Sequence, residues 1–301
     1  MPDTGHKKRY VLITGASTGI GRACALHLAR IGFAVLAGVR KPADGESLER
    51  DAGGGVTGIR IDVADLASIA AAAERVRGIV GDDGLCGLVN NAGIVVAGPV
   101  EFVSLEDWRR QFEVNFFGQI AVTQAMLPLL RQHVATHGPG AARIVMMSSI
   151  AGKVGQPIVS PYSSSKFSLE SMSDGLRIEL KPQGIHVCLI EPGAIDTPIW
   201  GKGAAHEQGV SPDTSARVLY GAMIDGIMER ARHAAETAIP AQRVADAVAA
   251  CLTRPTPRIR TLVGRDAKMA ALARRWLPDR WFDAIVSRAA GVSRTSGATA
   301  R

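Results

Sequence analysis

The chain has 301 residues, 47% of them hydrophobic, and a formal net charge of +7. This length can bury one large core, so we expect a single domain over residues 1–301. No apolar run reaches the length of a membrane span, and the polar, basic residues 1–9 predict no signal peptide.

The positive charge is concentrated at one end of the sequence. Residues 252–301 hold 11 Lys or Arg against 3 Asp or Glu, so the remainder of the chain is nearly neutral. This distribution argues against nucleic acid as a partner. Four scattered cysteines lie in predicted core elements and indicate buried thiols in a cytoplasmic protein rather than disulfides or metal ligands: Cys24, Cys86, Cys188 and Cys251.

Strand-like and helix-like stretches alternate along the chain. Apolar, β-rich segments predict strands at 10–13, 33–39, 56–61, 85–89, 143–147, 185–190 and 258–263. Helical apolar spacing predicts helices at 21–31, 68–80, 107–130, 162–180 and 241–252. Repeated β-α alternation with nearly continuous apolar strands indicates an α/β fold. We expect a doubly wound parallel sheet that binds ligands at the carboxyl ends of its strands.

A glycine-rich turn follows the first predicted strand and opens the first helix. Glycines let the backbone approach a pyrophosphate, and a helix N-terminus offers free N–H groups and a positive dipole. The expected dinucleotide contacts are Gly15, Ser17, Thr18, Gly19, Ile20 and Gly21. The spacing differs from G-x-G-x-x-G, so a glycine-rich turn without a ligand is the alternative.

The fourth predicted strand ends in Asn90-Asn91-Ala92-Gly93. Small residues there would let a cofactor pass close to the strand end, so Asn90, Ala92 and Gly93 are candidate contacts. Asn and Gly are equally ordinary in a plain β-turn.

Tyr162 and Lys166 are four residues apart and share one face of a predicted helix. A nearby ammonium favours the phenolate and can bring a hydroxyl that titrates near ~10 into a useful range. Ser149, at the carboxyl end of a strand, can hydrogen-bond a substrate oxygen. Singly these are typical of a surface Tyr–Lys pair and a turn serine. In chain order with the two glycine motifs, they indicate one catalytic site.

This set of motifs resembles the short-chain dehydrogenase/reductase family, in the form T-G-x-x-x-G-x-G, N-N-A-G, S and Y-x-x-x-K, over about residues 9 to 265. Finer features, such as Ile190-Glu191-Pro192-Gly193, are similar to the branch with retinol, 17β-hydroxysteroid and 3-hydroxybutyrate dehydrogenases. The resemblance implies a Rossmann-type three-layer αβα sandwich with strand order 3-2-1-4-5-6-7. It also implies an NAD(P)-dependent oxidoreductase that interconverts an alcohol and its carbonyl compound.

The resemblance also implies a role for individual residues. Tyr162 would exchange the proton, Ser149 would orient the substrate oxygen, and Lys166 would hold the nicotinamide ribose. Asn115 would hold a water in a proton relay; without the resemblance it is a polar residue at a bend in an apolar helix. Asp62 and Val63 would meet the adenine, and the loop with Pro192, Gly193, Ile195 and Thr197 would meet the nicotinamide.

The choice of cofactor depends on the end of the second strand. An acidic residue there would bind the ribose 2′-hydroxyl and repel a 2′-phosphate. Here Val39 stands at that position and Arg40 follows it, and a guanidinium suits a phosphate. We therefore expect NADP to be preferred over NAD, against the alternative that Arg40 and Lys41 only begin a solvated loop.

Two segments interrupt the β-α alternation. Residues 195–240 form a long polar insertion where a substrate lid would sit, and its apolar residues suit a lipophilic alcohol: Ile199, Trp200, Val218, Leu219, Met223 and Ile227. Residues 266–290 predict one or two amphipathic basic helices interrupted by Pro278. Their apolar stripe either walls the substrate pocket or lies on an anionic membrane surface.

The predicted helix 107–130 is apolar on nearly all sides, which implies burial on both sides. The resemblance implies that one of these sides is a subunit interface of a homodimer or homotetramer. His133 and His137 are interpreted as surface residues at a helix end, with no metal site expected. A non-catalytic protein that senses nicotinamide nucleotides on the same scaffold is the alternative function. The complete Ser149–Tyr162–Lys166 set argues against it.

Overall fold

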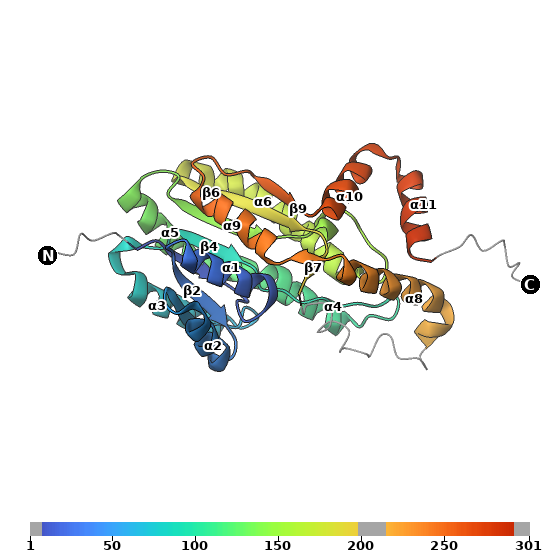
Figure 1. Cartoon of the computed structure of the whole chain (residues 1–301), viewed down its shortest axis with the longest axis horizontal. Coiled ribbons are helices and arrows are strands. Elements are labelled where there is room, and N and C mark those ends of the chain that lie inside the picture. The colour runs from blue at the N-terminus through green and yellow to red at the C-terminus, as the bar shows by residue number, and fades with distance from the viewer. Residues whose placement is uncertain (1–7, 198–214, 292–301) are drawn as a thin grey trace, which may run out of the picture.

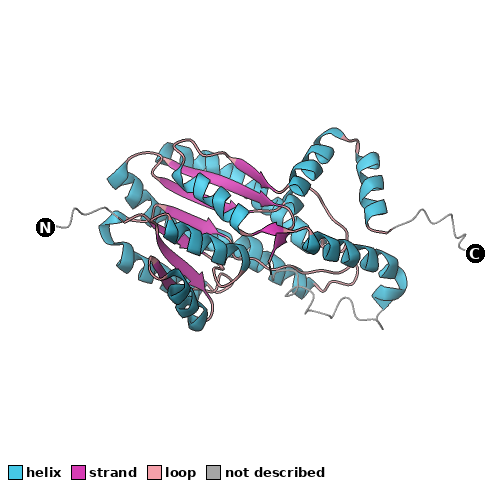
Figure 2. Cartoon of the chain, viewed as in Figure 1, coloured by secondary structure: helices cyan, strands magenta, loops and turns pink. Residues whose placement is uncertain are grey.

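The computed structural model of the chain describes residues 8–197 and 215–291. Its centre is a parallel sheet of seven strands in the order β3-β2-β1-β4-β5-β6-β9 (Figures 1 and 2). The strands are β1 (Tyr10–Ile13), β2 (Ala34–Val39), β3 (Val56–Arg60), β4 (Gly87–Asn90), β5 (Ala142–Met147), β6 (Ile185–Pro192) and β9 (Arg260–Val263). The predicted strand order is confirmed.

Helices cover both faces of the sheet, because successive strand residues point to opposite faces and both sets are apolar. Val11 and Ile13 face a core closed by α1 (Gly19–Arg30), α2 (Pro42–Ala52) and α9 (Gln242–Thr253). Leu12 faces a second core closed by α3 (Leu66–Val80), α5 (Gly118–His137) and α6 (Ser160–Leu180). The result is the expected three-layer αβα sandwich.

The helix expected over 107–130 is two helices joined by a π-helical turn. Helix α4 spans Leu105–Phe112, the turn spans Glu113–Phe117, and α5 follows. Apolar spacing cannot reveal this turn, because a single extra residue in the helix barely changes the pattern. Helix α2 was not expected either, since its 11 residues are largely polar.

The segment expected as a lid, 195–240, holds more regular structure than predicted. Helix α8 spans Ser215–Glu236, and the short strands β7 (Ile195–Asp196) and β8 (Ile239–Pro240) pair in parallel. Ile199 and Trp200 lie outside the described residues. Val218 and Leu219 are 85% and 66% exposed on α8. The expectation that their side chains line the substrate pocket is therefore wrong.

The C-terminal segment folds into α10 (Arg265–Trp276) and α11 (Asp279–Ala289), which project beside α8 at one end of the molecule (Figure 1). Pro278 stands at the N-cap of α11 and separates the two, as predicted. No helix among residues 8–197 and 215–291 is long and apolar enough to cross a membrane.

The prediction that His133 lies at the surface is wrong. Its side chain is buried, its Nδ1 lies 2.7 Å from the carbonyl oxygen of Asp83, and its ring stacks on that of His137. Burial lowers the pKa of His133, which favours the neutral ring. In the described part of the chain, no group of three potential metal-ligating side chains occurs. All four cysteines are buried and free.

Candidate active site

The glycine-rich turn between β1 and α1 packs directly on the end of β4. Gly15 has a φ of +64°, and a Cβ on it would lie 2.8 Å from Cα of Ala92. A Cβ on Gly21 would lie 2.2 Å from the carbonyl oxygen of Gly15. Only glycine fits at either position, so the turn brings bare backbone to the start of α1.

Helix α1 begins in a way that suits an anionic ligand. No acidic residue stands in its first turn, residues 19–22. The first N–H groups of a helix have no partner within it and carry the positive end of its dipole. The residues present therefore fit the pyrophosphate of a dinucleotide, with Gly19, Ile20 and Gly21 supplying the backbone.

Asn91 holds this turn in place, although the sequence analysis singled out only its neighbours. Its Nδ2 donates to the carbonyl oxygens of Thr14 at 2.9 Å and Gly15 at 3.1 Å. The Thr14 hydroxyl in turn accepts from the main-chain N–H groups of Asn91 and Ala92, both at 3.0 Å. Its position between two candidate residues was the available signal for this role.

The side chain of Asn90 points to the helix layer. Its Nδ2 donates to the Thr123 hydroxyl on α5 at 2.8 Å, and the residue is fully buried. Asn90 thus anchors the end of β4 through its side chain. A cofactor contact through its main chain stays a prediction, as do the contacts of Ala92 and Gly93.

Asn115 occupies the π-helical turn and is fully buried. Its Oδ1 accepts from the main-chain N–H of Ile94 at 2.8 Å, and its Nδ2 donates to the carbonyl oxygen of Ile94 at 3.0 Å. The amide also lies 3.4 Å from the Ser165 hydroxyl on α6. Asn115 therefore joins the chain after β4 to the helix that carries Tyr162 and Lys166.

Ser149, Tyr162 and Lys166 come together where β5 ends against α6. All three are largely buried, and the Ser149 hydroxyl accepts from the main-chain N–H of Ala151 at 3.1 Å. The Lys166 ammonium donates to the carbonyl oxygen of Met147 at 2.7 Å and lies 5.7 Å from the centre of the Tyr162 ring. One turn of α6 thus places the phenol and the ammonium over the strand that ends at Ser149.

Burial dominates the titration of this group. It raises the pKa of Tyr162, and a hydrogen bond with Ser149 lowers it in part. The hydrogen bond with Ser149 therefore favours the phenolate, and the expected effect of the Lys166 ammonium stays a prediction. Burial also lowers the pKa of Lys166 to about 8, and the charge of Glu170 opposes that fall.

The other expected cofactor residues lie along the same edge of the sheet. Arg40 is exposed just beyond β2, next to buried Val39. Asp62 follows β3, where its Oδ1 accepts from the main-chain N–H of Ala64 at 3.0 Å. Val63 is buried, and its carbonyl oxygen lies 2.4 Å from where a Cβ on Gly118 would stand. The strand ends of β2 and β3 thus present one cation and one carboxylate.

The loop after β6 is held by a residue that the sequence analysis missed. The Asp266 carboxylate, at the start of α10, accepts from the main-chain N–H of Ala194 at 2.7 Å. A Cβ on Gly193 would lie 2.1 Å from that carboxylate, so only glycine fits. Thr197 turns its hydroxyl toward the carbonyl oxygen of Ile195 at 3.4 Å. The local sequence gives no signal for this contact, because the partner of Asp266 lies 72 residues away.

A cavity of about 1750 Å³ opens beside the catalytic group. Ser149 and Tyr162 lie in its wall, and so do Gly193 and Thr197 from the loop after β6. The α8, α10 and α11 helices contribute apolar side chains: Ile227, Met269, Phe282, Ile285 and Val286. The inner face of the C-terminal helices therefore walls the pocket, as one of the two sequence alternatives predicted.

Comparisons with known proteins agree with this geometry. The family described as short chain dehydrogenase matches residues 9–208. The chain is 35% identical to the NADPH-dependent 3-dehydrocapnine reductase of Ornithobacterium rhinotracheale, over 92% of this chain and 95% of that protein. It is 33% identical to retinol dehydrogenase 5 of Mus musculus, over 92% of this chain and 87% of that protein.

A solved structure shows the same fold. The short chain dehydrogenase of Burkholderia cenocepacia, in complex with NADP, superposes with a TM-score of 0.68 at 26% identity. The alignment covers 94% of this chain and 98% of that chain.

Proposed function

The chain belongs to the short-chain dehydrogenase/reductase family and is an NAD(P)-dependent oxidoreductase acting on CH–OH groups, and we propose that its substrate is a lipophilic alcohol or carbonyl compound and its preferred cofactor NADP(H). The observation that carries the proposal is that Ser149 and Tyr162 lie together in the wall of a cavity that is also lined by apolar side chains. The single-domain organisation is part of the proposal.

Tyr162 is the proposed acid and base. In the direction of reduction, its hydroxyl gives a proton to the substrate oxygen, while Ser149 donates a hydrogen bond that holds that oxygen in place. When bound, the nicotinamide cofactor would supply the hydride to the carbonyl carbon, so that proton and hydride together would make the alcohol. In the reverse direction Tyr162 takes the proton back. Lys166 would hold the ribose of the cofactor, and Asn115, which contacts α6, would hold the water of the proton relay.

The preference for NADP(H) is supported by the charge at the end of β2. Arg40 is exposed there, and Val39 replaces the carboxylate that would repel a 2′-phosphate. One relative is named NADPH-dependent, and one solved relative binds NADP. Asp62, at the neighbouring strand end, is the proposed contact for the adenine side.

The proposed lipophilic substrate is supported by the lining of the cavity. Apolar side chains from α8, α10 and α11 surround the approach to Tyr162, and Phe282 is buried among them. Burial of apolar surface from the substrate would supply most of the binding free energy there. A relative is named retinol dehydrogenase, which is consistent with this chemistry.

The outer side of the C-terminal helices supports a contact with an anionic membrane surface. We define the outer apolar set as Leu272, Trp276 and Trp281, which are 60–71% exposed. Cations stand on the same two helices: Arg265, Lys268, Arg274, Arg275, Arg280 and Arg288, against three aspartates. Exposed tryptophans among arginines suit the boundary of an anionic bilayer. A lipophilic substrate could then enter the cavity from the membrane side.

An oligomer built on α4 and α5 is also proposed. A row of aromatic rings runs along these helices, from Trp108 through Phe112 and Phe116 to Phe117. Phe117 is 52% exposed, so an apolar face is available to a second copy.

A cytoplasmic location is supported by the four free, buried thiols.

The proposal is tested by a reductase screen with purified protein. Decanal, 2-decanone, a 3-ketosteroid, all-trans-retinal and 3-oxobutyrate are offered with NADPH and with NADH, and nucleotide oxidation is followed by absorbance. We expect turnover of the lipophilic carbonyls, faster with NADPH. Turnover confined to 3-oxobutyrate would contradict the lipophilic assignment, and a preference for NADH would contradict the cofactor assignment.

A further inference from the structure

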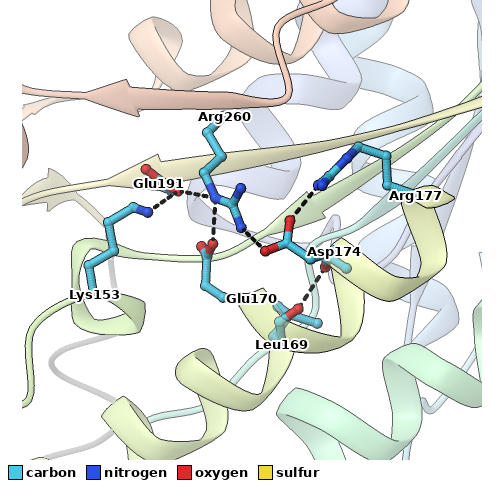
Figure 3. A network of polar contacts seen from close by, with 8 residues as sticks. Lys153, Leu169, Glu170, Asp174, Arg177, Glu191 and Arg260 are labelled. Carbon is cyan, nitrogen blue, oxygen red and sulfur yellow. Dashed lines mark hydrogen bonds and ion pairs between the residues drawn. The ribbon is translucent and has the colours of Figure 1, made fainter.

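Two buried carboxylates and two half-buried cations form a cluster beside the catalytic group, and we call them the ion network: Lys153, Glu170, Glu191 and Arg260 (Figure 3). They come from the turn after β5, from α6, from β6 and from β9. The proposed mechanism uses none of them. Their burial is expensive unless each charge is matched, so the arrangement calls for an explanation.

Arg260 is the member that touches the most partners. Its Nε donates to Oε2 of Glu170 at 3.0 Å and lies 3.3 Å from Oε1 of Glu191. Its Nη2 donates to Oδ2 of Asp174, one turn further along α6, at 2.7 Å. Lys153 approaches the same Oε1 of Glu191 at 3.2 Å. One guanidinium thus joins β9 to β6 and to two turns of α6.

Each acidic member stands next to a residue of the proposed site. Glu170 follows Lys166 by one turn of α6 and is 7% exposed. Glu191 is fully buried and directly precedes Pro192 and Gly193, which begin the loop on the nicotinamide side. The two carboxylates therefore connect the helix segment that carries Lys166 and the loop after β6 to the same guanidinium, that of Arg260.

Lys153 stands directly after the turn that begins at Ser149. A 3-10 turn, Ile150–Gly152, begins at Ser149, and the main-chain N–H of Lys153 donates to the carbonyl oxygen of Ile150 at 3.0 Å. This turn packs closely on α6. A Cβ on Gly152 would lie 3.1 Å from Cγ of Glu170 and 3.1 Å from the carbonyl oxygen of Lys166. A shift of the turn would therefore be felt directly at Lys166.

We propose that Arg260 is a positioning residue for the oxidoreductase reaction: its guanidinium binds Glu170 and Glu191 together and so fixes α6, the Ser149 turn and the loop after β6 relative to one another. Lys153 completes the clamp by tying the Ser149 turn to Glu191. The segment around β9 contacts the loop after β6 a second time, because Asp266, just beyond the strand, accepts from the main-chain N–H of Ala194 in that loop. The proposal rests on the proposed roles of Ser149, Tyr162 and Lys166.

Two buried carboxylates, those of Glu170 and Glu191, share the Arg260 guanidinium. Without Arg260, Glu170 and Glu191 would repel one another, and Lys153 would be left as the cation that pairs with Glu191. They would be expected to separate or to draw in water, which moves the segments that carry them. A misplacement of about 1 Å at reacting groups can cost on the order of a hundredfold in rate.

The test compares Arg260→Met and Arg260→Lys with Arg177→Met as the matched control. Arg177, also on α6, pairs with Asp174 but with neither Glu170 nor Glu191, so it removes an arginine ion pair outside the ion network. The kcat is measured at saturating NADPH with the carbonyl that the wild type reduces fastest in the screen. Hydrogen–deuterium exchange is measured over the whole chain without substrate, and residues 146–156 are the segment of interest.

We expect Arg260→Met to lower kcat by roughly ten- to a hundredfold and to raise exchange selectively in residues 146–156. Arg260→Lys should lie between this variant and the wild type, because an ammonium keeps the charge without the rigid fork. Arg177→Met should match the wild type in both measurements. If Arg260→Met does not fold, Arg260→Lys takes its place, with a smaller kcat loss and the same local rise in exchange expected.

Wild-type kcat in the folded Arg260 variants would overturn the proposal. So would exchange that rises evenly along the chain, because that pattern describes a loss of global stability instead of a released turn. The exchange measurement needs no substrate. A failure of the substrate assignment, with no carbonyl reduced by the wild type, is therefore distinguishable from a failure of this inference.

Discussion

Lys166 donates a hydrogen bond from its ammonium to the carbonyl oxygen of Met147 at 2.7 Å, across 19 residues of sequence. This bond ties α6 to the last residue of β5, two positions before Ser149. The lysine thereby links the helix that carries Tyr162 to the strand that leads to Ser149, in addition to its proposed contact with the cofactor ribose.

Replacing Tyr162 with phenylalanine should lower kcat by about 10²–10⁴-fold, because only the proton-transferring hydroxyl is removed. The ring still packs, so we expect the Kd for NADPH, measured by fluorescence titration, to stay within about threefold of the wild type. Tyr220→Phe is the matched control, since its hydroxyl contacts Glu101 on the exposed surface. Wild-type turnover by the Tyr162 variant would contradict the mechanism.

Arg40→Ala should remove the preference for NADP(H). A charge-assisted contact with the 2′-phosphate contributes about 1.5–3 kcal/mol, which is roughly ten- to a hundredfold in affinity. Titration with both nucleotides should show weaker NADPH binding and nearly unchanged NADH binding. Lys41→Ala, the exposed neighbour, controls for nonspecific attraction and should change far less. A wild type that binds NADH more tightly would disprove the assignment.

Asp266→Asn should weaken cofactor binding without direct contact with the reacting atoms. The carboxylate fixes the loop after β6 through the N–H of Ala194. The asparagine oxygen can still accept this hydrogen bond but without the charge, and a loss of about 1 kcal/mol corresponds to roughly a fivefold higher Kd for NADPH. Asp279→Asn, whose carboxylate pairs with Arg274 on the exposed C-terminal helices, is the control. Equal effects of the two changes would remove the special role of Asp266.

Glu191→Gln should change the pH dependence of stability. Burial and the charge of Glu170 outweigh the nearby Lys153 and Arg260 and raise the pKa of Glu191 to about 7. A raised carboxyl pKa means that the folded state disfavours ionisation. The stability of the wild type therefore falls, relative to the variant, as the pH rises from about 4.5 to about 7. The difference should grow to the order of 3 kcal/mol.

Urea unfolding at several pH values between about 5 and 8 measures this difference. Asp174→Asn gives the opposite sign, because the hydrogen bond from Arg260 lowers the pKa of Asp174. Its contribution to stability is present at neutral pH and is lost as the pH falls toward and through that lowered pKa. A Glu191→Gln variant that is equally destabilised at every pH would show that Glu191 stays ionised in the folded protein.

The C-terminal helices should bind anionic vesicles through their outer face. Sedimentation with phosphatidylcholine vesicles containing about 30% phosphatidylglycerol should recover the protein at low salt and less of it at high salt. A Trp276→Ala/Trp281→Ala double variant should bind the vesicles more weakly than the wild type by roughly tenfold or more. Val218→Ala/Leu219→Ala removes comparably exposed apolar side chains from α8 and should not matter. No binding of the wild type at low salt would end this hypothesis.

The sequence by itself determined the features that local geometry controls. Buried parallel strands are continuously apolar, so the seven strands and their layers followed from composition and alternation. Tyr162 and Lys166 share a helix face because four residues make about one turn. The glycine turn before α1 followed from the same logic, since glycine adopts a positive φ without steric cost and lets another backbone approach closely.

Only the tertiary structure decided the contacts between distant segments. Asp266 meets Ala194 across 72 residues, and Arg260 meets Glu170 across 90. Such pairs depend on how strands are ordered and how helices end, and no periodicity in the sequence records them. The π-helical turn at Asn115 and the burial of His133 were missed for the same reason. The energies that fix them come from partners elsewhere in the chain, Ile94 and Asp83, and not from neighbouring residues.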